Sequence, residues 1–428
     1  MMHLTLALSL VTLAANPIPQ PPPVPPPAPV ASMGASEVQV LAREIAAKVA
    51  AIRGLPFKRD VPVTIVDDAA ARRHFEELTD RYWPRDQMLL EQTALRQLGL
   101  LPGDYDIREG LFTVMEEQAA GYYDAEKDVF CVLNDMPRMS APIIIAHELT
   151  HALDDQHFDI DAMLRANMEA SDRSTAIASI VEGSGIAIMS RFMMQEMLAG
   201  RLTMDVLTEI QESEAGKGAK LTAAPQILQS SLLAPYLLGQ TFLLRGNLVE
   251  GLAKGVNPAD IDRAFKDPPL STEQILHPEK YWEPGSVDAP RPVVLADLSS
   301  ALGEGWALLG DGDLGEMPLA IMTGTPSVPI GSVESGSPAS WTNDAAAGWD
   351  GDLWQLYARG DMRVTILASL WDSEADAAQF AEAIKREGRT VRVSGDVVVL
   401  VAGDAGDAAA ALAADALEAL AARAAPAP

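Results

Sequence analysis

The spacing of apolar and polar residues predicts helices and short strands in the first third of the chain. The segment 36–55, SEVQVLAREIAAKVAAIRGL, has a helical period, and VPVTIVD at 61–67 predicts a short strand. A polar stretch, 68–96, suits further helices. YYDAEKDVFCVLND at 122–135 predicts two strand pieces around a turn, and a helix follows in APIIIAHELTHALDDQHF, started by Pro142. A strand therefore leads directly into this helix.

The pattern changes near residue 290, which divides the chain. Residues 161–265 are mostly helical, and SSLLAPYLLGQTFLLRG at 230–246 contains Pro235 and Gly239, which favour a buried, kinked helix over a membrane span. HPEKYWEPGSVDAPRP at 277–292 is rich in proline. Beyond it we expect strands in 353–360, 362–372 and 390–403, a helix capped by Ser373 and Asp376, and a second helix from about Asp407.

The fold class expected from these segments is α+β. We predict a mainly helical domain with a short edge sheet at 36–290, and a small α+β domain with a disordered tail at 291–428. We find no catalytic motif in the second domain, and expect it to be separable. Cys131 is the only cysteine. It lies in an apolar run, so we expect a buried core residue and no internal disulfide.

Charge and the N-terminal segment indicate where the protein works. The net charge of −28 argues against nucleic-acid and anionic-membrane partners, because both would repel the protein. An apolar run from Leu4 to Ala15 is too short to span a bilayer and predicts a signal peptide, 1–15. A proline-rich linker, 16–35, follows. The sequence thus predicts an extracytoplasmic protein, periplasmic or secreted, with no transmembrane span in the mature chain.

The motif HELTH places His147, Glu148 and His151 in the spacing H-E-x-x-H. Residues four apart on a helix lie about 40° apart around its axis and about 6 Å along it, so both imidazoles can bind one zinc ion. Glu148 beside them can accept a proton from a water whose pKa zinc lowers. The alternative of two surface histidines is weak, because the apolar PIIIA precedes the motif.

Two residues compete to be the third metal ligand. His157 has the metzincin spacing, but that design needs a sharp turn where this chain has Asp154. On a continuous helix His157 would lie about 9 Å along the axis from His151 and face another way. Glu182 is the only charged residue between Arg173 and Arg191, and it is followed by small residues that would let its helix approach closely. Glu182 could instead pair with a buried Arg or Lys.

The segments HELTHALDDQHFD, VEG and STEQILHPEKY together resemble a group of exported bacterial proteins related to gluzincin metallopeptidases, the thermolysin-like class. The similarity runs from about Val38 to Tyr281. It implies a zincin-like domain in which His147, His151 and Glu182 hold zinc and Glu148 is the general base. One position departs from the pattern: Ile186 stands where the class has an Asp that supports a zinc histidine. Asp154 or Asp155 could take over that role.

A peptidase also needs a donor for the oxyanion that forms during hydrolysis. His277 is our first candidate, and Tyr236, Tyr122 and Tyr123 are the others. The strand pieces around 122–132 are expected to supply an edge along which a substrate peptide lies by strand addition.

Together these features predict an exported single-zinc metallohydrolase, most simply an endopeptidase acting on a peptide or protein substrate. Three alternatives remain: a catalytically silent, zinc-stabilised binding protein, a metzincin-like peptidase that uses His157, and a metal-free helical scaffold.

Overall fold

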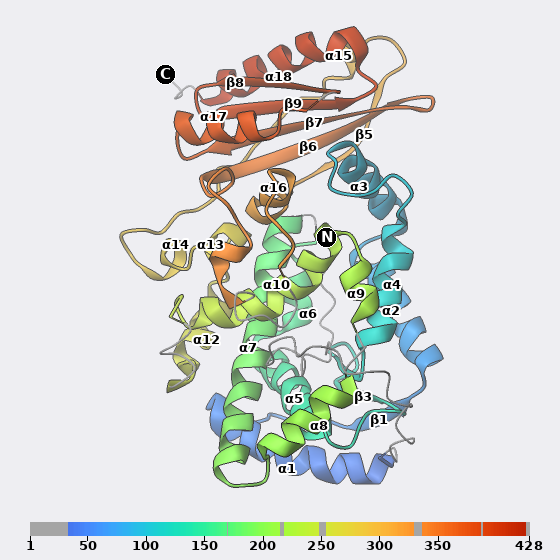
Figure 1. The fold of residues 1–428 in the computed structure, drawn as a ribbon, viewed down its shortest axis with the longest axis vertical. Helices are drawn as coiled ribbons and strands as arrows, with labels where there is room; N and C mark the ends of the chain where they lie inside the picture. Colours follow the sequence, from blue (N-terminus) through green and yellow to red (C-terminus); the bar gives the residue numbers. More distant parts are fainter. Residues whose placement is uncertain are drawn as a thin grey trace.

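The computed structural model describes residues 33–168, 170–214, 218–247, 254–328, 336–386 and 388–424. The expected signal peptide, most of the proline-rich linker and the end of the expected tail lie outside these residues. A mainly helical part carries a C-terminal part built on a five-stranded sheet (Figure 1). The predicted α+β class is confirmed.

The first part contains most of the helices. Its elements are α1 (Ala35–Arg53), β1 (Val63–Val66), α2 (Asp68–Tyr82), α3 (Arg85–Gln97), α4 (Ile107–Gln118), β2 (Gly121–Asp124), β3 (Val129–Leu133), α5 (Ala141–Phe158), α6 (Ile160–Arg165), α7 (Ser171–Leu198), α8 (Met204–Glu214), α9 (Ala219–Ala223), α10 (Gln226–Leu243), α12 (Pro258–Lys266), α13 (Thr272–Leu276) and α14 (Glu279–Trp282).

Local signals explain several of these boundaries. α1 ends at Gly54, which adopts the left-handed conformation that favours glycine at a helix C-terminus. Asp67 caps α2 by accepting a hydrogen bond from Ala70 N, and Asp106 caps α4 in the same way. Carboxylates thus fix where these helices start.

A three-stranded sheet leads the chain into α5. Its strand order is β1-β3-β2; β1 is parallel to β3 and β2 is antiparallel to it. Asp128, with φ of 52°, turns the chain between β2 and β3. β3 is followed by α5, the helix that carries His147, as the sequence predicted. β2 forms one edge of the sheet.

Helix α7 is the central element of the first part. It is the one helix in the described ranges that is long and apolar enough to cross a membrane, but 72% of its apolar window is buried inside the protein. α10, which contains Pro235, packs against it where Gly239 and Gly183 meet; a Cβ atom at Gly183 would lie 2.3 Å from the backbone of Gly239. The two helices are in backbone contact there.

The C-terminal part is a five-stranded sheet with helices on both faces. Its elements are α15 (Ser299–Leu302), β5 (Ala307–Gly312), α16 (Glu316–Met322), η3 (Pro338–Ser340), β6 (Trp349–Arg359), β7 (Met362–Trp371), α17 (Glu374–Ala383), β8 (Arg389–Ser394), β9 (Val397–Gly403), η4 (Gly406–Ala408) and α18 (Ala409–Ala424). The strand order is β5-β6-β7-β9-β8, with antiparallel neighbours. Ser373 Oγ accepts from Asp376 N, the cap expected for α17.

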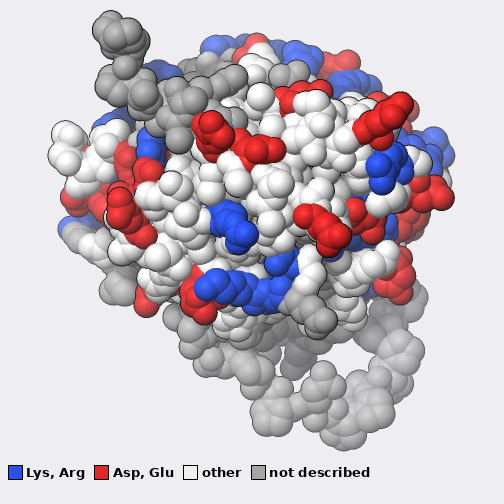
Figure 2. Space-filling view, turned by 90° about the horizontal axis from the view of Figure 1, so that it is seen from above, with Lys and Arg blue, Asp and Glu red and all other residues white. Residues whose placement is uncertain are grey.

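The surface at the C-terminal end carries both signs of charge. Viewed from that end, Lys and Arg side chains gather toward the middle and lower part of the face, and Asp and Glu side chains are spread around them (Figure 2). The net charge of −28 therefore does not make this face uniformly acidic.

One hydrophobic cluster joins the two parts, which differs from the expected separable domain. It combines Trp83, Leu95 and Leu98 from around α3 with residues such as Trp354 and Leu400 from the C-terminal sheet. Gln97 at the end of α3 donates to Arg363 O at 2.8 Å and accepts from the Thr365 hydroxyl. An apolar sheet face must be covered, and here α3 helps to cover it.

Carboxylates also accept hydrogen bonds from the backbone of other elements, and Asp313 links the two parts in this way. Asp313, from the C-terminal part, accepts from Asp172 N at 3.1 Å at the start of α7. The Asp172 carboxylate in turn accepts from Thr272 N at the start of α13. Asp352 accepts from Leu314 N and Gly315 N, both at 2.8 Å, just before α16. Each carboxylate thus satisfies backbone donors of another element.

We predict that Leu98→Ala lowers the free energy of unfolding by about 2–5 kcal/mol, the usual cost of emptying a filled core site. Leu98 is fully buried in the shared cluster. The matched control is Leu198→Ala, because Leu198 is 82% exposed, and it should change the free energy by less than about 0.5 kcal/mol. Urea unfolding measures both. Two separate transitions, with only one of them shifted, would contradict a shared core.

We also predict that Asp352→Asn flattens the pH dependence of stability. Burial raises the pKa of Asp352 to about 7. The folded protein therefore binds more protons than the unfolded chain between about pH 4 and 7, and this contribution to stability is lost as the pH rises through that interval. Urea unfolding of metal-free protein at acidic and neutral pH should show a smaller fall in the variant. Equal falls would mean that Asp352 is ionised throughout.

Candidate metal centre

His147 and His151 face one point from the same side of α5. Their Nε2 atoms are 2.9 Å apart, and the rings meet edge to face with centroids 4.5 Å apart. Both side chains are buried. This is the arrangement that residues four apart on a helix allow.

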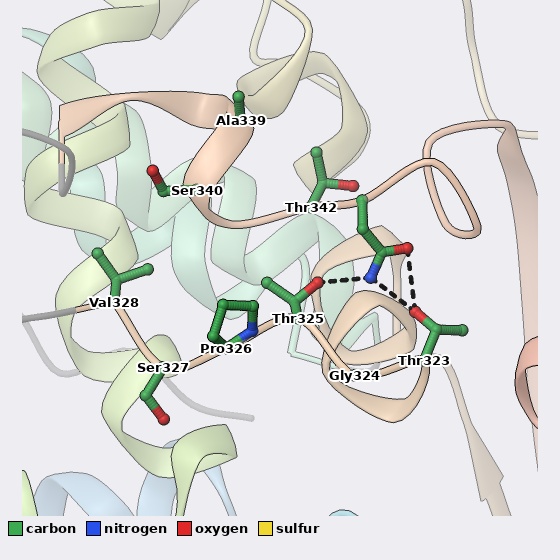
Figure 3. Close-up of a pocket in the computed structure, with 10 residues that line it drawn as sticks. Thr323, Gly324, Thr325, Pro326, Ser327, Val328, Ala339, Ser340 and Thr342 are labelled. Carbon is green, nitrogen blue, oxygen red and sulfur yellow. Dashed lines mark hydrogen bonds between the residues drawn. The ribbon is translucent and has the colours of Figure 1, made fainter.

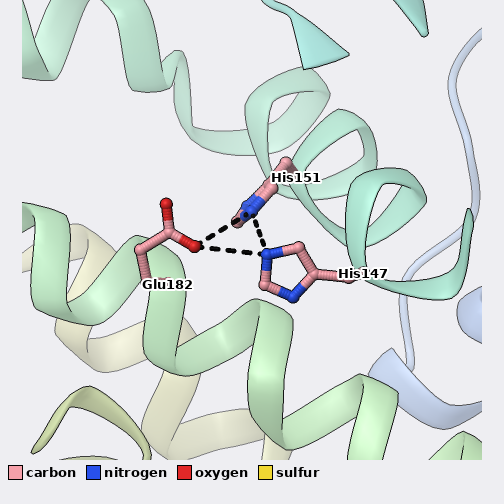
Figure 4. A group of neighbouring side chains, drawn as sticks. All are labelled: His147, His151 and Glu182. Carbon is pink, nitrogen blue, oxygen red and sulfur yellow. Dashed lines mark hydrogen bonds and ion pairs between the residues drawn. The ribbon is translucent and has the colours of Figure 1, made fainter. Parts of the chain in front are cut away.

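Glu182 reaches the same point from α7. Its Oε2 lies 3.2 Å from His147 Nε2 and 3.4 Å from His151 Nε2 (Figure 4). Burial alone would raise the pKa of Glu182, but His151 and His147 outweigh burial and lower it. Among the described residues, Glu182 forms its ion pairs with these two imidazoles and not with a buried Arg or Lys. The three residues come together from two helices.

Small residues in α7 make this approach between the helices possible. A Cβ atom at Gly185 would lie 2.5 Å from His147 Cε1, so any side chain there would displace the imidazole. Gly183 faces α10 at Gly239, and Ser184 donates to Asp154 of α5. Three consecutive residues of α7 therefore contact three different partners: Gly183 meets α10, Ser184 meets Asp154, and Gly185 meets the imidazole of His147.

The cluster suits a zinc ion by its spacing and its donor types. The three atoms are 2.9, 3.2 and 3.4 Å apart. Ligands at about 2.0–2.1 Å in a tetrahedral site lie about 3.3 Å from each other. Two imidazole nitrogens and a carboxylate oxygen form a donor set that zinc commonly uses in catalytic sites. Within the described ranges these three residues form the group, and a fourth protein ligand does not join them.

Glu148 lies beside the cluster without belonging to it. Its Oε2 accepts from Tyr123 N at 2.7 Å, so the edge strand β2 fixes the carboxylate. Its Oε1 is 4.0 Å from His147 Nε2 and has no hydrogen-bond partner among the described residues. Burial raises the pKa of Glu148 to about 8; Glu182 adds to the rise, and His147 and Tyr123 N oppose it.

His157 lies away from the cluster, because α5 continues past Asp154. The left-handed residue is Asp159, just after the helix, with φ of 54°. His157 Nε2 instead lies 2.8 Å from the carbonyl oxygen of Pro56. The turn that a metzincin site requires at Asp154 is absent from α5.

The prediction that Asp154 or Asp155 supports a zinc histidine is wrong for the described residues. Asp154 binds Arg53 and Ser184, and Asp155 accepts from the Tyr123 hydroxyl and Ile160 N. Neither contacts an imidazole: in the described part of the chain, Nδ1 of His147 and of His151 is without a hydrogen-bond partner.

His277, our first candidate for the oxyanion donor, belongs to a different network. Its Nε2 lies 3.1 Å from Glu316 Oε1; burial opposes a rise in the pKa of His277, but Glu316 raises it. It follows α13, which bonds to α7 at Asp172, ten residues before Glu182. Ten helical residues span about 15 Å. Among the described residues, His277 pairs with Glu316 and not with a residue of the cluster, so the structure gives no support for ranking it first.

Tyr236 is the candidate donor that lies next to a cluster residue. Its buried ring is 6.1 Å from that of His147, with the planes 20° apart. Tyr122 stacks on His74, and the Tyr123 hydroxyl donates to Asp128 and Asp155. The position of Tyr236 could have been predicted from the sequence. Gly239 lies one helical turn after Tyr236, so the face of α10 that meets α7 carries both residues.

A second group of carboxylates has a simpler explanation than a metal. Glu273, Asp288 and Asp372 converge, but Lys280 Nζ lies among them at 2.6, 2.9 and 3.1 Å. The ammonium group therefore occupies the place between the carboxylates that a metal ion would take, and it offsets part of their charge. It also ties β7 to the helical part, because Asp372 directly follows β7.

A polar pocket of about 360 Å³ lies in the C-terminal part (Figure 3). Hydroxyl groups line it, and Asn343 Nδ2 donates to the Thr325 and Thr323 hydroxyls. None of the described residues that line it is titratable. This described lining offers no acid or base group for hydrolysis.

A family model described as a domain of unknown function, DUF8575, matches residues 307–424. This range runs from β5 to α18, and it lies outside the candidate metal centre. No curated protein matches the chain. No solved structure matches it either.

We predict that Glu182→Ala abolishes stoichiometric zinc binding, whereas His157→Ala keeps it near one ion per chain. The first change removes an atom that lies within 3.4 Å of both imidazoles, and the second removes a side chain that contacts Pro56. Elemental analysis after dialysis against a weak chelator measures both. Zinc retained by Glu182→Ala and lost by His157→Ala would reverse the assignment.

Proposed function

We propose that the protein is a zinc metallohydrolase, most simply an endopeptidase, in which His147, His151 and Glu182 hold the ion and Glu148 is the general base. The observation that carries the proposal is the placement of Glu148. One of its oxygens is fixed by Tyr123 N, and the other lies beside the three-residue cluster with no hydrogen-bond partner among the described residues. A purely structural zinc site needs only ligands and gives such a carboxylate no role.

Each residue has a defined task in this proposal. Zinc, when bound, supplies a Lewis acid for the scissile carbonyl and for the attacking water. Glu148 accepts the proton of that water at Oε1 and passes it to the leaving amine, while Tyr123 N holds Oε2. Tyr236, beside His147, is the candidate that orients the substrate carbonyl and stabilises its negative charge.

The edge strand β2 gives a reason to favour a peptide substrate. It meets Glu148 at Tyr123, so an extended peptide that paired with this edge would pass the carboxylate. All four residues of β2 are buried, so the peptide would have to uncover this edge to reach it. The apolar N-terminal run before the proline-rich linker supports a substrate outside the cytoplasm.

The burial of the site favours one alternative, a zinc-stabilised binding protein. His147, Glu148, His151 and Glu182 are each at most 3% exposed. A substrate must reach these residues, whereas a structural ion needs no access. The hydrolase requires Glu148 as a base, whereas the zinc-stabilised binding protein does not.

We predict that Glu148→Gln keeps zinc but loses hydrolysis, because it keeps the shape of the side chain and removes the base. Activity on an unstructured protein substrate should fall by roughly 10²–10⁴-fold, the usual contribution of a general base. Zinc content should stay near that of wild type.

Glu316→Gln is the matched control, because Glu316 is another fully buried Glu and pairs with His277. Its activity should stay close to that of wild type. If wild type and Glu148→Gln cleave equally, or if neither cleaves while both hold zinc, the structural role replaces the enzymatic one.

A further inference from the structure

We propose that the hydrogen bond between Asp154 and Ser184 sets the register of α5 against α7, and so positions His147, His151 and Glu182 before the metal binds. This proposal rests on the metal site proposed above. Asp154 and Ser184 are positioning residues, because neither belongs to the three-residue cluster.

The bond joins the two helices close to the cluster. Ser184 Oγ donates to Asp154 Oδ2 at 2.5 Å, and both side chains are fully buried. Asp154 lies three residues after His151 on α5, and Ser184 lies two residues after Glu182 on α7. A shift of one helix along the other would therefore break this bond. The same shift would move Glu182 away from His147 and His151.

Apolar side chains of α5 and α7 share one core cluster, and the Asp154–Ser184 bond adds a directional contact to that packing. Gly185 allows close approach but offers no side chain to interlock with α5. The cluster itself consists of two imidazole nitrogens and a carboxylate oxygen, which without a cation attract one another only through a shared proton. A metal site needs its ligands within about 0.5 Å of their places, so a directional bond is required nearby.

A buried arginine keeps Asp154 directed toward Ser184. Arg53, at the end of α1, donates through Nε to Asp154 Oδ1 at 2.7 Å, and it is fully buried. Its Nη1 pairs with Asp262 of α12 at 2.8 Å. Because Arg53 occupies one oxygen of Asp154, the other is left for Ser184. The network of Ser184, Asp154, Arg53 and Asp262 therefore joins α7, α5, α1 and α12 around the site.

The test compares two serine variants in the same helix. Ser184→Ala removes the bond between α5 and α7. The matched control is Ser179→Ala: Ser179 is also buried, but its hydroxyl donates to Thr175 O within α7. Chelator competition measures the zinc Kd, and thermal unfolding of the metal-free protein measures stability. We expect both variants to lower the Tm of the metal-free protein by similar amounts.

Only Ser184→Ala should weaken zinc binding, by about 10–100-fold, the usual effect of losing an outer partner of a metal ligand. Asp154→Asn should instead change stability more than zinc binding. Its amide NH₂ can donate to Ser184 Oγ while its oxygen still accepts from Arg53, so the link between the helices persists. Stability should then fall, because Arg53 loses its charged partner, while the zinc Kd stays closer to wild type than in Ser184→Ala.

An unchanged Kd in Ser184→Ala, or equal losses in the two serine variants, would overturn the proposal while leaving the metal site intact. Wild type that binds no zinc would overturn the site itself and this proposal with it.

Discussion

The close contact between α5 and α7 is the constraint on which the candidate site depends. Gly185 leaves room for the imidazoles, and Glu182 reaches both of them from the same helix. This places a carboxylate in a buried position where desolvation opposes its charge, and its interactions with His151 and His147 outweigh that effect. A cation bound by all three residues would stabilise the same buried charge. The site is therefore explained by one helix contact and the charge that the contact buries.

The C-terminal part contributes to the same arrangement. Asp313 accepts from the backbone at the start of α7, and the shared hydrophobic cluster joins α3 to the C-terminal sheet. α7, which carries Glu182, is thus held at its N-terminus by the region that matches the domain of unknown function. The two parts thus share a hydrophobic cluster and a backbone contact at the start of the helix that carries Glu182.

Local signals in the sequence were sufficient to predict α5 and the strand before it. They also predicted that Glu182 lies with the two histidines. The H-E-x-x-H spacing acts within one helix, and a lone charge in an apolar helix must find a partner. Long-range packing could not be predicted in the same way. The separation of His277 from the cluster depends on where α13 meets α7, and the cover of the C-terminal sheet by α3 joins residues far apart in the chain. Periodicity shows that a face is apolar, but it does not name the element that covers it.

X-ray absorption at the zinc edge of the metal-loaded protein tests the central claim most directly. The account predicts two imidazole nitrogens and a carboxylate oxygen at about 2.0–2.2 Å, with a solvent oxygen in the fourth position. Three imidazole ligands, or a zinc ion surrounded by solvent oxygens alone, would contradict it.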